Sequence, residues 1–276
     1  MVLFLDSGAG GLSYCASFKK SNPDVECVYI ADTKNFPYGK KSKEELTLLL
    51  SALVKKLVFY FSPSVIVLAC NTASVSALSE LRAIYPSISF VGTVPAMRPA
   101  AVFTKTGVIG VLGTERTICD PYIHALLDAA NKETGKCAKL IPAAAGALVD
   151  FIENDFWSAS DEQKIDVSKK YINYFKTQGA DAVVLGCTHF LMLLDFFKTL
   201  AGKETGVFDS VRGVCRQTEK LLACGAASGG AVDKPADAVF TPVRVFVTES
   251  PPESKWERIC SFFGFDYSAV LDGKAD

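Results

Sequence analysis

Short apolar runs rich in β-branched residues recur along the chain and alternate with longer segments of helical periodicity. The runs occupy residues 2–5, 27–31, 65–69, 88–91, 108–112, 182–185 and 243–247. Helical patterns lie between most of them, for example at residues 43–61, 73–84, 115–131 and 161–178. Continuous apolar strands that alternate with helices are typical of buried parallel sheets. The pattern therefore predicts an α/β fold with mainly parallel sheets flanked by helices.

Local signals indicate where some of these helices begin and end. Ser42 stands three residues before Glu45, as in a capping box that opens a helix. Ser62-Pro63 ends the same helix and returns the chain to a strand. Asp120-Pro121 falls inside the third helical pattern, so we expect that helix to start or bend there.

Two strand ends carry nearly the same sequence. Val67-Leu-Ala-Cys-Asn-Thr-Ala73 and Val184-Leu-Gly-Cys-Thr-His-Phe190 each finish an apolar run with a cysteine and small polar residues. A strand and loop at residues 3–8 and at 111–114 precede them at similar separations. We therefore expect two similar α/β domains that each contribute one cysteine loop. The first spans residues 1–95, with the C-terminal segment from about 211 to 276 packing back on it, and the second spans residues 96–210.

Composition and charge narrow the classes of function. The 276 residues are 49% hydrophobic, which suits one long domain or two shorter ones. The net charge is −1, so no broad attraction to nucleic acid or to an anionic membrane is expected. The N-terminus does not resemble a signal peptide, and no run approaches the roughly 20 apolar residues of a membrane span. We expect a soluble, cytoplasmic protein whose partner is a small molecule or another protein.

The cysteine and histidine content argues against disulfides and structural zinc. An odd count of nine cysteines without secretory features favours reduced thiols. No CxxC pair occurs, and the two histidines are His124 and His189, so no metal site is expected. Most of the cysteines are expected to be small buried apolar residues. His124 lies within a helical pattern, and we interpret it as structural.

Cys70 and Cys187 stand where ligands bind in open parallel sheets, just beyond the carboxyl ends of strands. Asn71-Thr72 and Thr188-His189 follow them at an expected helix start, where free N–H groups favour an anion and the thiolate form of a cysteine. Packing alone explains many cysteines at strand ends, but it does not explain the matched polar residues. Two thiols that flank one cavity could remove and return a proton on opposite faces of a carbon, as a racemase requires.

Two more loops at strand ends could belong to the same site. Asp6-Ser-Gly-Ala-Gly-Gly11 offers a carboxylate, a hydroxyl and a glycine-rich turn into a helix. Its spacing matches neither the dinucleotide fingerprint nor the phosphate loop. Asp32-Thr-Lys-Asn-Phe-Pro-Tyr-Gly39 could offer a hydroxyl and backbone amides. Each loop taken alone is also compatible with a plain turn.

Five ordered motifs resemble glutamate racemases of the aspartate/glutamate racemase family. They are Asp6-Ser-Gly-Ala-Gly-Gly-Leu12, Pro37-Tyr-Gly-Lys-Lys-Ser42, Ala69-Cys-Asn-Thr-Ala73, Gly92-Thr-Val-Pro-Ala96 and Leu185-Gly-Cys-Thr-His189. The resemblance runs with gaps from residue 1 to about 265. It implies two α/β domains related by pseudo-twofold symmetry and a cofactor-independent isomerase that interconverts L- and D-glutamate. It also implies a role in supplying D-glutamate for peptidoglycan, and so in cell wall biogenesis and cell shape.

The resemblance assigns roles to individual residues. Cys70 and Cys187 would be the two acid/base thiols, with Cys70 taking the α-proton of D-glutamate and Cys187 that of L-glutamate. The residues that align with substrate-binding positions are Asp6, Ser7, Tyr38, Gly39, Asn71, Thr72, Thr188 and His189, with Thr114 and Thr117 as a further pair. The resemblance implies no metal and no cofactor. Family members commonly form dimers, but their subunit arrangements differ and no surface pattern here selects an interface, so the oligomeric state is left open, with a homodimer as one candidate.

The chain departs from the family pattern at two places. Leu191 replaces a proline that usually follows the Thr-His-aromatic step, which bears on how the next helix starts. The segment Ile141–Asp150 differs from the family's usual Cys-Pro and Pro-Leu-Val-Glu pattern. The family's glutamate could therefore correspond to Asp150, to Glu153 or to neither, and we leave it out of the predicted site.

Three other hypotheses remain open at this point. The substrate could be another small dicarboxylate such as aspartate, because one methylene changes binding by only ~1 to 3 kcal/mol. A thiol hydrolase using Cys187 with His189 is a second hypothesis, which leaves Cys70 unexplained. The third is a noncatalytic binding protein on the same fold.

Overall fold

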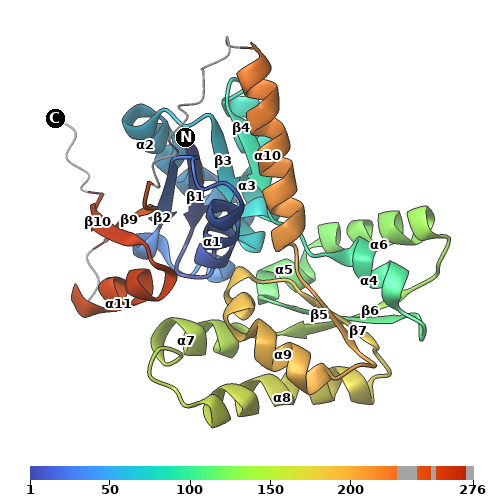
Figure 1. The fold of residues 1–276 in the computed structure, drawn as a ribbon. Helices are drawn as coiled ribbons and strands as arrows, with labels where there is room; N and C mark the ends of the chain where they lie inside the picture. The colour runs from blue at the N-terminus through green and yellow to red at the C-terminus, as the bar shows by residue number, and fades with distance from the viewer. Residues whose placement is uncertain (229–240, 250–252, 272–276) are drawn as a thin grey trace. The chain divides into compact units, whose positions relative to one another are not determined.

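The computed structural model describes residues 1–228, 241–249 and 253–271, which form two compact units (Figure 1). Of the described residues, one unit contains 1–93, 211–228, 241–249 and 253–271, and the other contains 94–210. Each contains one sheet of parallel strands, as the alternating pattern predicted. That the units are independently folding domains, divided near residues 95 and 210, stays a prediction.

The first unit is built on a six-stranded sheet in the order β10-β9-β2-β1-β3-β4. Its strands are β1 (Val2–Asp6), β2 (Cys27–Ala31), β3 (Val65–Leu68), β4 (Ser89–Gly92), β9 (Arg244–Val247) and β10 (Asp266–Val270). Its helices are α1 (Leu12–Ser21), α2 (Lys43–Phe61), α3 (Asn71–Ile84), α10 (Val211–Ser228) and α11 (Glu253–Phe263), with two 3-10 helices, η1 (Thr33–Asn35) and η2 (Tyr38–Lys40).

The second unit is built on a four-stranded sheet in the order β6-β5-β7-β8. Its strands are β5 (Val108–Gly113), β6 (Lys139–Ala144), β7 (Ala182–Leu185) and β8 (Gly206–Phe208). Its helices are α4 (Met97–Phe103), α5 (Glu115–Cys119), α6 (Pro121–Thr134), α7 (Gly146–Asn154), α8 (Asp161–Thr177) and α9 (Leu194–Ala201), with the 3-10 helix η3 (Thr188–Leu193).

Alternate residues of the central strands pack on opposite faces of each sheet. In the first unit, Leu3 and Leu5 of β1 belong to the core cluster under α2 and α3, whereas Phe4 packs on Phe18 of α1. In the second unit, Ile109 and Val111 of β5 pack in the cluster with α4 and α6. Both faces of these strands are therefore covered, which explains why their sequences are apolar throughout.

The two sheets reverse their winding at equivalent places. In the first unit the chain passes from β1 to β2, then crosses back to β3 on the other side of β1. In the second unit it passes from β5 to β6 and crosses back to β7 on the other side of β5. Ligands of open parallel sheets bind outside the carboxyl ends of the strands that flank such a reversal. This rule points to the ends of β1 and β3 and to those of β5 and β7.

The helix boundaries follow the predicted capping signals. The hydroxyl of Ser42 accepts a hydrogen bond from the N–H of Glu45 at 3.1 Å and caps α2. The third helical pattern is divided at Asp120, whose carboxylate accepts from the N–H of Tyr122 at 3.0 Å at the start of α6. Pro121 is the first residue of α6, a position where its missing N–H costs nothing.

Three strands have no counterpart among the predicted apolar runs. They are β6, β8 and β10, and each lies at the edge of its sheet. Of the helices in the described part of the chain, none combines the length and the apolar character that a membrane crossing needs.

Candidate active site

Cys70 and Cys187 occupy the same local position in their respective units. Both follow a central strand in an extended conformation, with φ −146° and ψ 120° at Cys70 and φ −140° and ψ 137° at Cys187. Each is the residue that caps the following helix, and each side chain is 7% exposed. The repeated sequence is therefore also a repeated backbone geometry.

The residue before each cysteine is fixed to the neighbouring central strand in the same way. The N–H of Ala69 donates to the carbonyl of Leu5 at 2.8 Å, and the N–H of Gly186 donates to the carbonyl of Leu112 at 2.6 Å. A Cβ atom at Gly186 would lie 3.0 Å from that carbonyl oxygen, so this close approach favours glycine. The backbone next to each cysteine is therefore fixed by a hydrogen bond to the neighbouring strand.

The loop after β1 is shaped by the carboxylate of Asp6. This buried side chain accepts hydrogen bonds from the N–H groups of Ser7 and Gly11, both at 2.7 Å. A Cβ atom at Gly11 would lie 2.8 Å from Cβ of Ala69 and 2.9 Å from the hydroxyl of Tyr29. The glycine therefore lets the loop lie against the residue that precedes the first cysteine.

Tyr38 is held by Asp32, and Gly39 follows it in the 3-10 helix η2. The hydroxyl of Tyr38 donates to Oδ2 of Asp32 at 2.7 Å, and the same carboxylate accepts from Asn35 at 2.9 Å and from Thr248 at 2.7 Å. Burial, together with the charge and hydrogen bond of Asp32, raises the pKa of Tyr38 well above its ordinary value. Tyr38 therefore stays a neutral phenol, whose oxygen can still accept a hydrogen bond.

The start of α3 carries a buried amide that no described residue satisfies. The side chain of Asn71 is 2% exposed, and neither its nitrogen nor its oxygen has a hydrogen-bond partner among the described residues. Leaving a buried polar group unsatisfied costs ~1 to 3 kcal/mol. Thr72 beside it is also buried, and Cys70 shares a core cluster with Tyr38. The geometry favours Asn71 as a group that binds a polar ligand.

In the second unit, Cys187, His189 and Glu153 form a buried chain of contacts. The sulfur of Cys187 lies 3.7 Å from Nδ1 of His189, and Nε2 of His189 lies 2.8 Å from Oε1 of Glu153. Burial lowers the pKa of His189, but the hydrogen bonds and charges of Cys187 and Glu153 outweigh it and raise the pKa well above 6.5. A protonated imidazole beside a thiol stabilises the thiolate.

Glu153, which supplies the carboxylate that contacts His189, is one of the two residues that could correspond to the family's glutamate. Glu153 is buried on α7, whereas Asp150 on the same helix is exposed. A signal for Glu153 does exist in the sequence, because it lies four residues after Val149 and so shares the apolar face of an amphipathic helix. A carboxylate at a buried helix position needs a partner, and His189 is that partner.

The remaining predicted residues of the second unit also lie at strand ends. The hydroxyl of Thr114 caps α5 by accepting from the N–H of Thr117 at 3.3 Å, and the two hydroxyl oxygens are 3.1 Å apart. Thr117 is buried, and so is Thr188, which directly follows Cys187. The predicted threonine pair therefore comes together.

The expected helix start after Cys187 is confirmed, and the helix is of the 3-10 type. Thr188 and His189 are the first two residues of η3, and α9 begins at Leu194. Leu191, which replaces the family's usual proline, lies within η3. The buried side chains of this segment are Thr188, His189, Phe190, Leu191 and Leu193, and Met192 is half-buried, so most of η3 faces the core.

Among the described residues, no three histidine, cysteine, aspartate or glutamate side chains gather as a metal site would require. The roles of the residues above in substrate binding and proton transfer stay predictions.

Comparison with known proteins identifies a set of similar sequences and structures. The model of the Asp/Glu/hydantoin racemase family matches residues 13–218. A glutamate racemase from Treponema pallidum (strain Nichols) is 36% identical over 218 residues, covering 79% of this chain and 80% of that protein. A glutamate racemase from Sphingopyxis alaskensis is 37% identical over 244 residues, covering 87% and 88%.

Solved structures show the same similarity. The structure of Escherichia coli glutamate racemase in complex with L-glutamate and the activator UDP-MurNAc-Ala gives a TM-score of 0.80 at 28% identity, covering 98% of this chain and 96% of that chain. Glutamate racemase isoform RacE1 from Bacillus anthracis gives a TM-score of 0.80 at 26% identity, covering 99% and 97%.

Proposed function

The chain belongs to the Asp/Glu/hydantoin racemase family, and from this premise we propose that it is an isomerase that interconverts L-glutamate and D-glutamate. The observation that carries the proposal is the matched pair of cysteine loops, one after a central strand of each unit. Their equivalence requires an explanation that uses both thiols. Such an activity is consistent with supply of D-glutamate for peptidoglycan.

Racemisation requires removal of the α-proton on one face of the carbon and its return on the other. With D-glutamate, the Cys70 thiolate takes the α-proton and the C–H electron pair stays on carbon. The Cys187 thiol then gives its proton to the opposite face and becomes a thiolate. With L-glutamate, the two cysteines exchange roles. Each thiol acts as a general base in one direction and as a general acid in the other.

His189 and Glu153 support the thiolate form of Cys187. Glu153 stabilises the protonated imidazole at 2.8 Å, and the imidazole in turn faces the sulfur at 3.7 Å. Glu153 does not need to touch the substrate, so we assign it as a positioning residue. The hypothesis of a thiol hydrolase gains some support from this Cys-His-Glu arrangement, which resembles the groups of a catalytic triad. It leaves the matched geometry of Cys70 without a role.

The predicted substrate-binding residues suit a zwitterionic dicarboxylate. The side chains of Asn71, Thr72 and Thr188 can donate to carboxylate oxygens, with Thr114 and Thr117 as further donors, and helix starts favour anions. Asp6, the oxygen of Tyr38 and the backbone of Gly39 are the candidate partners of the ammonium group. Preorganised donors of this kind also stabilise the charge that develops when the α-proton leaves.

The direct test uses deuterated water without any added cofactor. Either enantiomer of glutamate is incubated with the protein, and optical rotation and deuterium at the α-carbon are followed. We expect both enantiomers to converge on the racemate with deuterium at the α-carbon. Absence of exchange from either enantiomer with folded protein would contradict the proposal, and trapping of an acyl-enzyme by mass spectrometry would favour the hydrolase instead.

Three finer expectations remain part of the proposal. Preference for glutamate over aspartate is tested by comparing kcat/KM for the two amino acids, because a single methylene separates them. A homodimer is tested by light scattering coupled to size-exclusion chromatography. The cytoplasmic location stays a prediction that cell fractionation can test.

A further inference from the structure

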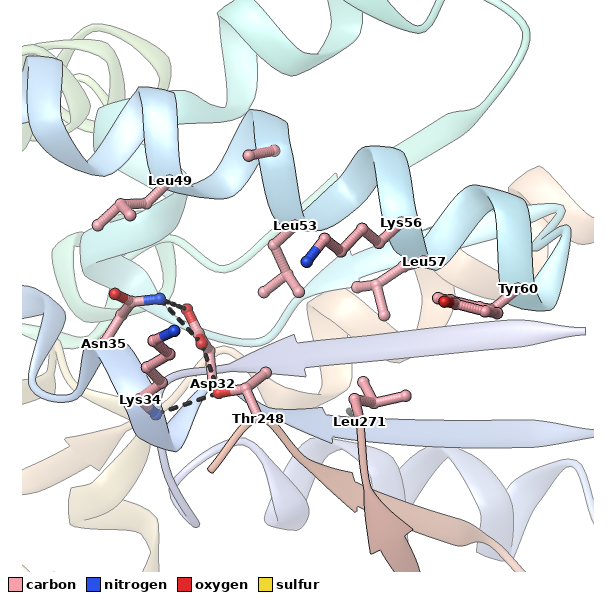
Figure 2. A pocket seen from close by; sticks show the side chains of 11 residues that line it. Asp32, Lys34, Asn35, Leu49, Leu53, Lys56, Leu57, Tyr60, Thr248 and Leu271 are labelled. Atoms are coloured by element: carbon pink, nitrogen blue, oxygen red, sulfur yellow. Dashed lines mark hydrogen bonds between the residues drawn. The ribbon is translucent and has the colours of Figure 1, made fainter. Parts of the chain in front are cut away.

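Asp32, the residue that holds Tyr38, also lines a separate pocket of the first unit with a volume of about 230 Å³ (Figure 2). Asp32 directly follows β2, Thr248 directly follows β9, and Leu271 directly follows β10. The pocket therefore lies at the carboxyl ends of three neighbouring parallel strands. This edge of a parallel sheet is where ligands characteristically bind.

One wall of the pocket is an apolar stripe of α2. Leu49, Leu53 and Leu57 recur at four-residue intervals and so share one face of the helix. Figure 2 shows their side chains directed toward the strand ends, with Leu271 on the opposite side. This wall suits an aliphatic or aromatic group.

Two lysines supply positive charge at the same pocket. Lys34 comes from η1 and Lys56 from α2, and neither ammonium group forms a salt bridge with a described residue. Among the described lining residues the one acidic side chain is Asp32, whose carboxylate is hydrogen-bonded to Tyr38, Asn35 and Thr248. The two lysines outweigh this one carboxylate, so the described lining carries a net charge of +1.

We propose that this pocket binds a small organic anion with an apolar body, such as an aryl phosphate, sulfonate or carboxylate, and that its occupancy changes the KM for glutamate. The anionic group would face Lys34 and Lys56, and the apolar body would lie on the leucines of α2. The second part of this inference rests on the proposed function.

The connection to the substrate loops runs through one carboxylate. Asn35 and Thr248 line the pocket and donate to Asp32, and Asp32 accepts from the hydroxyl of Tyr38. A ligand that shifts Asn35 or Thr248 changes how the shared carboxylate holds Tyr38. Such coupling means that each ligand changes the binding affinity of the other by the same factor.

Binding is tested by isothermal titration calorimetry with phenyl phosphate in a phosphate-free buffer. We expect one phenyl phosphate to bind per chain. Inorganic phosphate, which lacks the apolar ring, and phenol, which lacks the anionic group, should bind much more weakly. Lys34→Gln and Lys56→Gln should each weaken binding about two- to fivefold, the range typical of exposed ion pairs, and the double variant by about the product. Lys55→Gln is the matched control, because Lys55 is exposed on the same helix and does not line the pocket.

A second variant blocks the pocket instead of removing charge. Ala52 is exposed and lines the pocket, so Ala52→Phe should fill it and abolish binding while the protein still racemises glutamate. Unchanged phenyl phosphate binding in both Ala52→Phe and the double lysine variant, or no binding by wild type at millimolar concentration, would overturn the site.

The coupling is tested by measuring KM for glutamate with and without saturating phenyl phosphate. We expect at least a twofold change of KM in wild type and in Lys55→Gln, and none in Ala52→Phe. An unchanged KM in wild type with bound phenyl phosphate would refute the coupling. Failure of the proposed function is distinguishable, since it would show as absent racemisation without any phenyl phosphate, whereas the calorimetric result does not depend on catalysis.

Discussion

The imidazole of His189 contacts Glu153 through one nitrogen, at 2.8 Å, and faces the sulfur of Cys187 through the other, at 3.7 Å. All three side chains are buried, so the contacts are poorly screened by water. The carboxylate of Glu153 and the thiol of Cys187 therefore contact the same imidazole, and a substitution at Glu153 should change the electrostatic environment of the sulfur.

Glu153→Gln should lower kcat for racemisation by about 10- to 100-fold with little change in KM, because the amide cannot stabilise the protonated imidazole. Steady-state kinetics measure this effect. The matched control is Asp150→Asn on the same helix, where the carboxylate is exposed, and its kcat should be unchanged. Equal effects of the two substitutions would refute the positioning role of Glu153.

The pKa of His189 gives a second measurement on the same variant. NMR titration should find the pKa well above 6.5 in the wild type and closer to 6.5 in Glu153→Gln. The other histidine signal, from His124, can be assigned by its loss in His124→Gln. A pKa of His189 that does not respond to Glu153→Gln would contradict the buried contact.

The raised pKa of His189 also predicts how stability depends on pH. A pKa that is higher in the folded than in the unfolded state contributes stability that is fully present below about 6.5 and is lost as the pH rises through the folded-state value. Urea unfolding at a series of pH values should therefore show the advantage of wild type over Glu153→Gln shrinking above pH 6.5. If the difference in the free energy of unfolding between wild type and Glu153→Gln increased with pH, the raised pKa of His189 would be contradicted.

Asn71→Ala should separate binding from folding. The buried amide has no partner among the described residues, so its removal should change the free energy of unfolding by less than about 1 kcal/mol. If the amide binds a substrate carboxylate, kcat/KM should fall by about 10- to 150-fold, equivalent to ~1.5 to 3 kcal/mol. The control is Ser168→Ala on α8, another buried side chain without a hydrogen-bond partner in the described structure, which should leave kcat/KM unchanged.

Gly11→Ala should disturb the loop beside Cys70. The added methyl would lie 2.8 Å from Cβ of Ala69, and we expect a loss of about 1 to 3 kcal/mol in the free energy of unfolding, together with lower activity. Gly213→Ala on α10 is the control, because nothing lies within 4 Å of its added methyl. That substitution should stabilise the protein by about 0.5 to 1 kcal/mol, as measured by urea unfolding.

The buried strands were predictable from the sequence, and so was the edge strand β4, whereas the edge strands β6, β8 and β10 were not. Each apolar run forms a strand, because strands covered on both faces must be apolar throughout. β6 carries Pro142 and only half-buried or exposed residues, β8 has three residues, and β10 also consists of exposed and half-buried residues. An edge strand tolerates proline and polar residues since only one side pairs with a neighbour.

The candidate site was predictable where its residues are local in sequence. The two cysteine loops are each defined within a few residues, so their repeated sequence indicates them, and the threonine pair, also local, was indicated by the resemblance to the family. The contact between Glu153 and His189 joins α7 to η3, and the bond between Tyr38 and Asp32 joins a 3-10 helix to a strand end. Such contacts depend on how elements pack, which periodicity and motifs do not specify.

The most direct test of the account is α-proton exchange by the single-cysteine variants in deuterated water. Cys187→Ala should abolish racemisation yet exchange the α-proton of D-glutamate, and Cys70→Ala should do so only with L-glutamate, since the remaining thiol still serves one face. Cys260→Ala should behave as wild type, because burial raises the pKa of Cys260 to about 12 and keeps it a thiol. Racemisation by either Cys70→Ala or Cys187→Ala at the wild-type rate, or exchange of both enantiomers by both variants, would contradict the two-thiol mechanism.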